Sequence, residues 1–86
     1  MSIKTVINKS ELHRAVVTFF HENQASIDTP RGIATWVRGE YNNVKEVLEE
    51  LTAQGILEAH KVTSTTGYAY TRDTKVINEV KKALGA

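Results

Sequence analysis

The sequence predicts an α+β domain that is mainly helical, in the order helix, short strand, helix, helix, two-stranded hairpin and C-terminal helix. Apolar side chains recur with helical spacing in four separate stretches. The single proline and the five glycines mark the boundaries between those stretches. Two β-rich segments late in the chain flank a short polar turn, as in a hairpin. With 86 residues, we expect residues 1–86 to form one domain.

The first helix is expected at about residues 9–23. Asn8 with Glu11 fits a capping box at its start, and Ser10 is an alternative N-cap. The preceding segment, IKTVI, is short and β-branched, so a strand, an arm and an extra helical turn all stay open. The apolar stripe of the helix consists of Leu12, Ala15, Val16, Phe19 and Phe20.

The next elements are a very short strand and a short helix. Ile27 is the lone apolar residue of a polar stretch and predicts the strand. Thr29 suits the N-cap of the helix, and Pro30 suits its first position, where a missing N–H is harmless. Gly39 is expected to end the helix in the left-handed conformation. The apolar stripe, which places tryptophan in the core, is Ile33, Trp36 and Val37.

The third helix is expected to begin at Asn43, with Glu46 as its capping-box partner, and to end at Gly55. A strand then runs from Ile56 to about residue 63. The tetrapeptide STTG, residues 64–67, has turn chemistry, with the glycine able to supply a positive φ. The buried stripe of the third helix is Val44, Val47, Leu48 and Leu51.

Residues 68–72 are expected to form the second strand of the hairpin. Tyr68 and Tyr70 share one face of that strand, so one or both should cover the core. Asp73 or Thr74 would cap the final helix. Its apolar stripe is Val76, Ile77, Val80, Ala83 and Leu84.

Three segments carry a resemblance to a known family. TPRGIATWV matches the first helix of a helix-turn-helix, NNVKEVLEELTAQGIL matches the second helix with its glycine exit, and the hairpin closing on GYAY matches a wing. In this order the chain resembles a winged helix-turn-helix domain over nearly its whole length. The resemblance implies a DNA-binding transcriptional regulator or an accessory nucleic-acid-binding protein, with double-stranded DNA as its partner.

The second helix of the motif departs from that family. DNA-binding members usually carry Ser, Thr, Arg, Lys and Gln on its outward face. In this chain Glu46 and Glu49 lie near the centre of that face and Glu50 lies on its flank. Residues 39–55 hold one basic and four acidic side chains, between flanking blocks of five basic and three acidic. The net charge of +1 is also low for a protein that binds DNA through charge.

The candidate nucleic-acid contacts surround the predicted helix starts and the hairpin. The free N–H groups at a helix N-terminus and the hydroxyls of serine and threonine can donate hydrogen bonds to DNA phosphates. A glutamate carboxylate can accept a hydrogen bond from the amino group of cytosine. A plain polar turn is an equally weighted interpretation of the hairpin tip. The candidates are Thr29, Arg31, Arg38, Tyr41, Asn42, Asn43, Lys45, Glu49, Lys61, Ser64, Thr65, Thr66 and Arg72.

Two alternatives remain open from the residues. A winged-helix domain can instead be a protein-interaction module, in which Glu46, Glu49 and Glu50 would dock a basic protein partner. RNA binding and a purely structural role are lesser possibilities. The final helix either closes the core of the monomer or pairs with a second copy in a homodimer.

The remaining classes lack support in the sequence. No phosphate loop, G-x-S-x-G elbow or G-x-G-x-x-G motif is present, so we expect no enzyme and no cofactor. Without cysteines, and with His13 and His21 about 12 Å apart on one helix, a metal site is not expected, and the histidines should be surface residues. No apolar run approaches the roughly 20 residues of a membrane span, and no signal peptide is evident, so a cytoplasmic location is expected.

Overall fold

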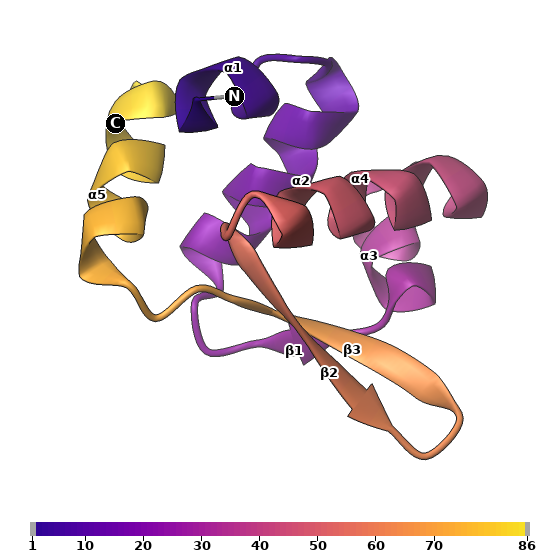
Figure 1. Cartoon of the computed structure of the whole chain (residues 1–86). Coiled ribbons are helices and arrows are strands. Elements are labelled where there is room, and N and C mark those ends of the chain that lie inside the picture. The colour runs from indigo at the N-terminus through magenta and orange to yellow at the C-terminus, as the bar shows by residue number, and fades with distance from the viewer. Residues whose placement is uncertain (1, 86) are drawn as a thin grey trace.

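The computed structural model describes residues 2–85, and the predicted fold class and element order are confirmed (Figure 1). The IKTVI segment, for which three conformations were open, forms an additional short helix. The elements are α1 (Ile3–Ile7), α2 (Glu11–Glu22), β1 (Ile27–Asp28), α3 (Pro30–Val37), α4 (Tyr41–Ala53), β2 (Leu57–Val62), β3 (Thr65–Tyr70) and α5 (Thr74–Ala83).

The three strands form one antiparallel sheet in the order β1-β3-β2. β1 contributes only the pairs Ile27–Ala69 and Asp28–Tyr68. β2 and β3 pair along their whole length, from Leu57–Tyr70 to the tip of the hairpin, and this hairpin projects beyond the helices (Figure 1). The hairpin is therefore anchored at its base and free at its tip.

The core is built from the apolar stripes of the helices and from the base of the sheet. Full burial of one such side chain is worth about 1.5–3 kcal/mol, so these residues carry most of the stability. Tyr68 and Tyr70 are both buried, as their shared strand face predicted. The largest fully buried side chains are Phe20, Ile7, Ile33, Leu48, Leu51, Ile56, Val6, Val16, Val17, Val44 and Val80.

Of the two N-caps left open for α2, Ser10 is confirmed, whereas the predicted start of α4 is wrong. Ser10 caps α2 by accepting from the backbone N–H of His13, so Asn8 is not an N-cap and ends α1 instead. α4 starts two residues earlier than expected, because the Glu40 carboxylate accepts from the backbone N–H of Asn42 at 3.0 Å. The expected capping box at residues 43–46 is therefore not formed.

The glycines at the two turns have other roles than expected. Arg38, rather than Gly39, takes the left-handed conformation, with φ of 56°. Gly39 instead allows close packing, because a Cβ there would lie 2.8 Å from Cγ2 of Val44. The hairpin turns at residues 63–64, so Gly67 lies within β3, where its missing Cβ makes room for Ile27 at 2.9 Å.

The tryptophan does not enter the core, contrary to expectation. The side chain of Trp36 is 70% exposed and packs against Phe19, with ring centroids 5.8 Å apart. The buried face of α3 is centred between Ile33 and Val37. At about 100° per residue, Trp36 lies beyond the edge of that face.

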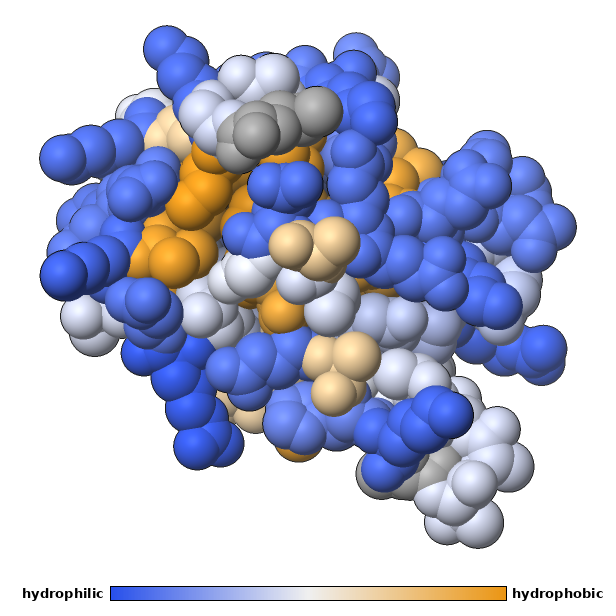
Figure 2. Space-filling model, viewed as in Figure 1, coloured by the Kyte–Doolittle hydropathy of each residue, from blue (hydrophilic) through white to orange (hydrophobic). Residues whose placement is uncertain are grey.

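The last helix, α5, packs on α1 and α2 of the same chain. Of the two roles left open for it, α5 therefore closes the core of the monomer. Val80 is fully buried. Apolar surface remains visible where α5 meets α1 (Figure 2), and the partly buried apolar residues there are Ile3, Val76, Ile77, Ala83 and Leu84.

Candidate nucleic-acid interface

The start of α3 presents one exposed cation. Thr29 caps the helix, its hydroxyl accepting from the backbone N–H of Gly32 at 3.2 Å. Pro30 occupies the first helical position and is buried. Arg31 follows directly and is exposed, so its guanidinium is the charged group of this helix end.

The outward face of α4 carries both polar and charged side chains. Asn42, Asn43, Lys45, Glu46 and Glu49 are all exposed. The opposite face is held in the core by the four predicted apolar residues, which are buried. The orientation of this helix is therefore set by packing, and its polar face is left free for contacts.

The hairpin tip holds a basic residue among hydroxyl groups. A hollow of about 200 Å³ at the tip is lined by Lys61 and by residues 63–66. Lys61, Ser64 and Thr65 are exposed, while Thr66 is half-buried. Thr65 and Thr66 belong to β3 rather than to the turn, so strand pairing fixes their directions.

These three elements meet around two adjoining hollows. One, of about 260 Å³, is lined by Thr29, Pro30, Arg31, Tyr41 and Thr65. The other, of about 340 Å³, is lined by Pro30, Tyr41, Lys45, Glu49, Ser64, Thr65, Thr66 and Tyr68. Most of the predicted contact residues thus lie together on one concave surface between α3, α4 and the hairpin. We call this surface the α4–wing surface.

Five of the predicted residues do not line these two hollows, and one of them, Lys61, lines the hollow at the hairpin tip. Asn42 and Asn43 are exposed on the first turn of α4, beside the hollows. Arg38 is exposed at the opposite end of α3 from Arg31. Arg72 follows β3 and precedes the N-cap of α5, so it lies at the base of the hairpin.

The α4–wing surface has an excess of positive charge. Arg31 and Lys45 are the cations that line its two hollows, and Lys61 lines the neighbouring hollow at the hairpin tip. In residues 2–85 none of the three forms an ion pair. Glu49 is the single acid lining the hollows. Burial raises the pKa of the Tyr68 phenol above its usual 10, and the Glu49 carboxylate adds to the rise. Tyr68 therefore keeps its proton at neutral pH and can donate it in a hydrogen bond.

Sequence reasoning missed Pro30 and Tyr68 as lining residues. The period-two alternation of β3 places Tyr68 on the same face as Thr66, which is the signal for it. It also misjudged Glu50, which accepts hydrogen bonds from Lys9 and His13 at 2.7 Å each and so is not free on the outward face. His13 is buried rather than on the surface.

In the described part of the chain, no three His, Cys, Asp or Glu side chains are grouped so as to hold a metal ion. No helix among residues 2–85 has the length and apolar character needed to cross a membrane.

Solved structures share this architecture. The sequence matches no protein-family model and no curated protein. The chain is similar to ZitR of Lactococcus lactis, in a single mutant (TM-score 0.61, 17% identity, 79% of this chain and 47% of that chain covered). It is also similar to a double mutant of ZitR (0.61, 17%, 80% and 48%) and to that mutant in apo form (0.62, 17%, 95% and 70%). The chain spans about half the length of the first two ZitR chains.

The likeness covers the helices, the short strand and the hairpin of the winged-helix domain of ZitR. The fold of this chain is therefore that of a winged helix-turn-helix domain, in which α3 and α4 form the helix-turn-helix and β2–β3 the wing. At 17% identity the likeness establishes the fold alone.

Proposed function

We propose that the chain is a DNA-binding transcriptional regulator that contacts double-stranded DNA through the α4–wing surface. One observation carries the proposal. Exposed basic and hydroxyl-bearing residues from α3, α4 and the wing converge there, although the chain as a whole has a net charge of only +1. A regulator of this kind would bind cytoplasmic DNA, so the proposed location is the cytoplasm.

The residue types suit a division of labour. Arg31, Lys61 and the hydroxyls of the wing tip would contact phosphates on either side of a groove, which positions a protein without specifying a sequence. Arg38 and Arg72 would extend these backbone contacts. Asn42 and Asn43 begin the helix that would enter the major groove, and an asparagine amide can bind adenine in a bidentate way.

The acidic residue on this surface makes the proposal sharper. Glu49 would be repelled by phosphates but can accept a hydrogen bond from a cytosine amino group, which is a minority contact. We therefore expect Glu49→Gln to leave affinity for random DNA the same or tighter. A site that contains the contacted cytosine would instead bind the variant more weakly.

Random-sequence duplex DNA tests the proposal, with fluorescence anisotropy at about 50 and 200 mM salt. Binding that collapses at the higher salt is expected. Arg31→Ala and Lys61→Ala should each weaken binding to every sequence and lower the salt slope by about one. Lys75→Ala, an exposed lysine of α5, is the matched control and should bind normally. Absence of binding at low salt would contradict the proposal.

A protein-interaction module is the second candidate, favoured by two exposed acids. Glu46 and Glu49 form no ion pair within residues 2–85, whereas Glu50 is engaged. A basic partner protein would dock on them. The double change Glu46→Lys with Glu49→Lys should then abolish capture of that partner, and duplex DNA should bind poorly to either form.

Dimerisation through α5 belongs to the same proposal. Apolar surface left at the α1–α5 junction would pair with that of a second copy, giving two half-sites. Sedimentation velocity over a range of concentrations tests it, because a monomer at every concentration would contradict a dimer.

A further inference from the structure

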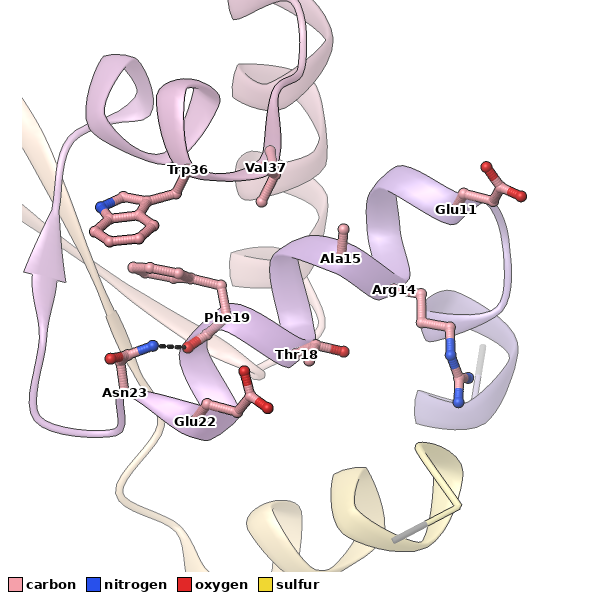
Figure 3. Close-up of a pocket in the computed structure, with 9 residues that line it drawn as sticks. All are labelled: Glu11, Arg14, Ala15, Thr18, Phe19, Glu22, Asn23, Trp36 and Val37. Carbon is pink, nitrogen blue, oxygen red and sulfur yellow. Dashed lines mark hydrogen bonds between the residues drawn. The ribbon is translucent and has the colours of Figure 1, made fainter.

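A further hollow lies at the opposite end of α3 from the α4–wing surface. It has a volume of about 590 Å³ and runs along α2 beside the end of α3 (Figure 3). α3 has eight residues and is about 12 Å long, so its two ends serve different surfaces. The residues lining this groove are Glu11, Arg14, Ala15, Thr18, Phe19, Glu22, Asn23, Trp36 and Val37.

The wall of the groove is aromatic. Trp36 and Phe19 face each other with an interplanar angle of 38° (Figure 3). Phe19 is half-buried, whereas Trp36 is 70% exposed. An indole left this exposed is unusual for a side chain that gains so much from burial, and tryptophan is enriched among the residues that dominate protein interfaces.

The ends of the groove are acidic. Glu11 lies at one end and Glu22 at the other, and both are exposed. The one lining cation is turned away from the aromatic pair (Figure 3). Arg14 donates to the carbonyl of Leu84 at 2.8 Å and to Oδ1 of Asn8 at 2.9 Å, so its charge is directed at the end of α5.

The acidic ends of the groove favour a basic binding partner over a second copy of this chain. A second copy seated face to face would bring two further carboxylates to an acidic rim, which is unfavourable. A basic partner would place its cations beside Glu11 and Glu22. The open, elongated shape suits a helix lying in a groove rather than an enclosed small molecule.

The spacing along α2 defines the partner further. Glu11, Ala15, Thr18 and Glu22 follow the positions i, i+4, i+7 and i+11, which form one stripe. The two carboxylates are about 16 Å apart along the axis. The small side chains between them allow a second helix to pack at about 8–10 Å.

We propose that this groove docks a basic amphipathic helix of a partner protein. The helix carries Lys or Arg at two positions eleven residues apart, which pair with Glu11 and Glu22. Bulky apolar residues at the intervening +4 and +7 positions pack on Ala15, Phe19 and Trp36. Because the groove and the α4–wing surface are separate, the partner binds whether or not DNA is bound.

A synthetic helix tests this directly. An alanine- and glutamine-based peptide of roughly 18 residues carries Arg, Leu, Leu and Arg at the stated spacing. Trp36 is the only tryptophan of the chain, so its fluorescence reports on the groove alone. We expect saturable binding with a blue shift of the emission. A peptide with Glu in place of both Arg residues should bind at least about tenfold more weakly, and equal binding of the two would overturn the proposal.

Matched variants locate the binding. With a fluorescein-labelled peptide, Trp36→Ala should weaken binding at least about tenfold, since truncated hot-spot residues have effects of this size. Tyr41→Ala removes an exposed aromatic of the α4–wing surface and should not affect the peptide. Glu11→Lys with Glu22→Lys should reverse the preference toward the acidic peptide, whereas Glu46→Lys with Glu49→Lys should not.

Two further results would overturn the proposal, provided that circular dichroism shows the variants to be folded. One is peptide binding that ignores the charge reversal at residues 11 and 22. The other is a Trp36 blue shift that depends on protein concentration without peptide, which would assign the groove to a second copy. The Trp36→Ala variant should still bind DNA normally. Normal DNA binding by that variant would show that failure of the groove proposal leaves the proposed DNA-binding function intact.

Discussion

The Nε2–H of His13 donates to Oε1 of Glu50 at 2.7 Å and joins α2 to α4. The other imidazole nitrogen is hydrogen-bonded to the Ser10 hydroxyl at 2.7 Å, and Lys9 donates to Oε2 of Glu50 at 2.7 Å. The adjacent acidic residues of α4, Glu49 and Glu50, therefore have different surroundings. Glu50 stabilises the contact between two helices, and the neighbouring Glu49 remains on the outward face.

This network predicts a dependence of stability on acid pH. The hydrogen bond from His13, and then that from Lys9, lowers the pKa of Glu50 below its usual 4.5. The contribution is therefore present above pH 4.5 and is lost as the pH falls through the lower pKa of the folded state. We expect Glu50→Gln to have a lower Tm near neutral pH and a smaller loss of Tm in acid, measured by circular dichroism. Glu49→Gln, one residue away, should behave like the unmodified chain, and equal curves for all three would contradict the assignment.

Gly39 provides a packing prediction. A Cβ there would meet Val44 of α4 at 2.8 Å and Leu12 of α2 at 3.1 Å. Gly39→Ala should therefore destabilise the fold by about 1–3 kcal/mol, the usual effect of overpacking. Gly32→Ala is the control, because its Cβ would be at an ordinary 3.5 Å from Thr29, and it should be neutral or stabilising by up to about 1 kcal/mol. Urea denaturation measures both, and equal effects would refute the packing role.

Arg38 provides a prediction that separates stability from binding. Its φ of 56° is a left-handed conformation that is unfavourable for an L-residue by about 1–2 kcal/mol. Arg38→Gly should therefore raise the free energy of unfolding, by about 0.5–1 kcal/mol after the added chain entropy of glycine. If Arg38 contacts phosphate, the same variant should bind all DNA sequences more weakly. Unchanged affinity would remove Arg38 from the proposed interface.

Tyr70 predicts a loss of stability in alkali. Burial raises its pKa to about 12, and its hydroxyl is hydrogen-bonded to Nδ1 of His21 at 3.0 Å. The folded state thus retains a proton that the unfolded chain releases near pH 10, so stability falls as the pH rises from 10 toward 12. Tyr70→Phe should flatten this fall and lower stability near neutral pH by about 1 kcal/mol for the lost hydrogen bond. Tyrosinate absorbance that shows no step near pH 12 would contradict it.

The buried faces could be predicted because they are periodic. The stripe of α4 repeats at helical spacing over three turns and is buried as predicted, and burial of such a stripe is the largest favourable term in folding. The face of α2 was predicted only in part: Leu12, Ala15 and Phe19 are half-buried, and the buried residues are His13, Val16, Val17 and Phe20. Strand alternation placed Tyr68 and Tyr70 correctly for the same reason. Short elements were less predictable, because α3 has only two turns and its stripe did not reveal that Trp36 lies outside it.

The candidate site was predictable in its residue types but not in its membership. Exposed cations and hydroxyls on α3, α4 and the hairpin were all identified, yet which of them converge depends on how three elements are packed. The structure brings Arg31, Lys45 and Thr65 together around the hollows and leaves Arg38 and Arg72 apart. No spacing along the chain contains that information.

The sequence by itself determined the order of the elements from α2 onward and the core face of α4, because hydrophobic periodicity is local along the chain. Only the tertiary structure decided which glutamate is bound and which is free, which glycine is needed for space, and where the tryptophan lies. Each of these depends on atoms from elements far apart in sequence. Glu50 meets Lys9 and His13, and Gly39 meets Leu12, only after the helices have packed.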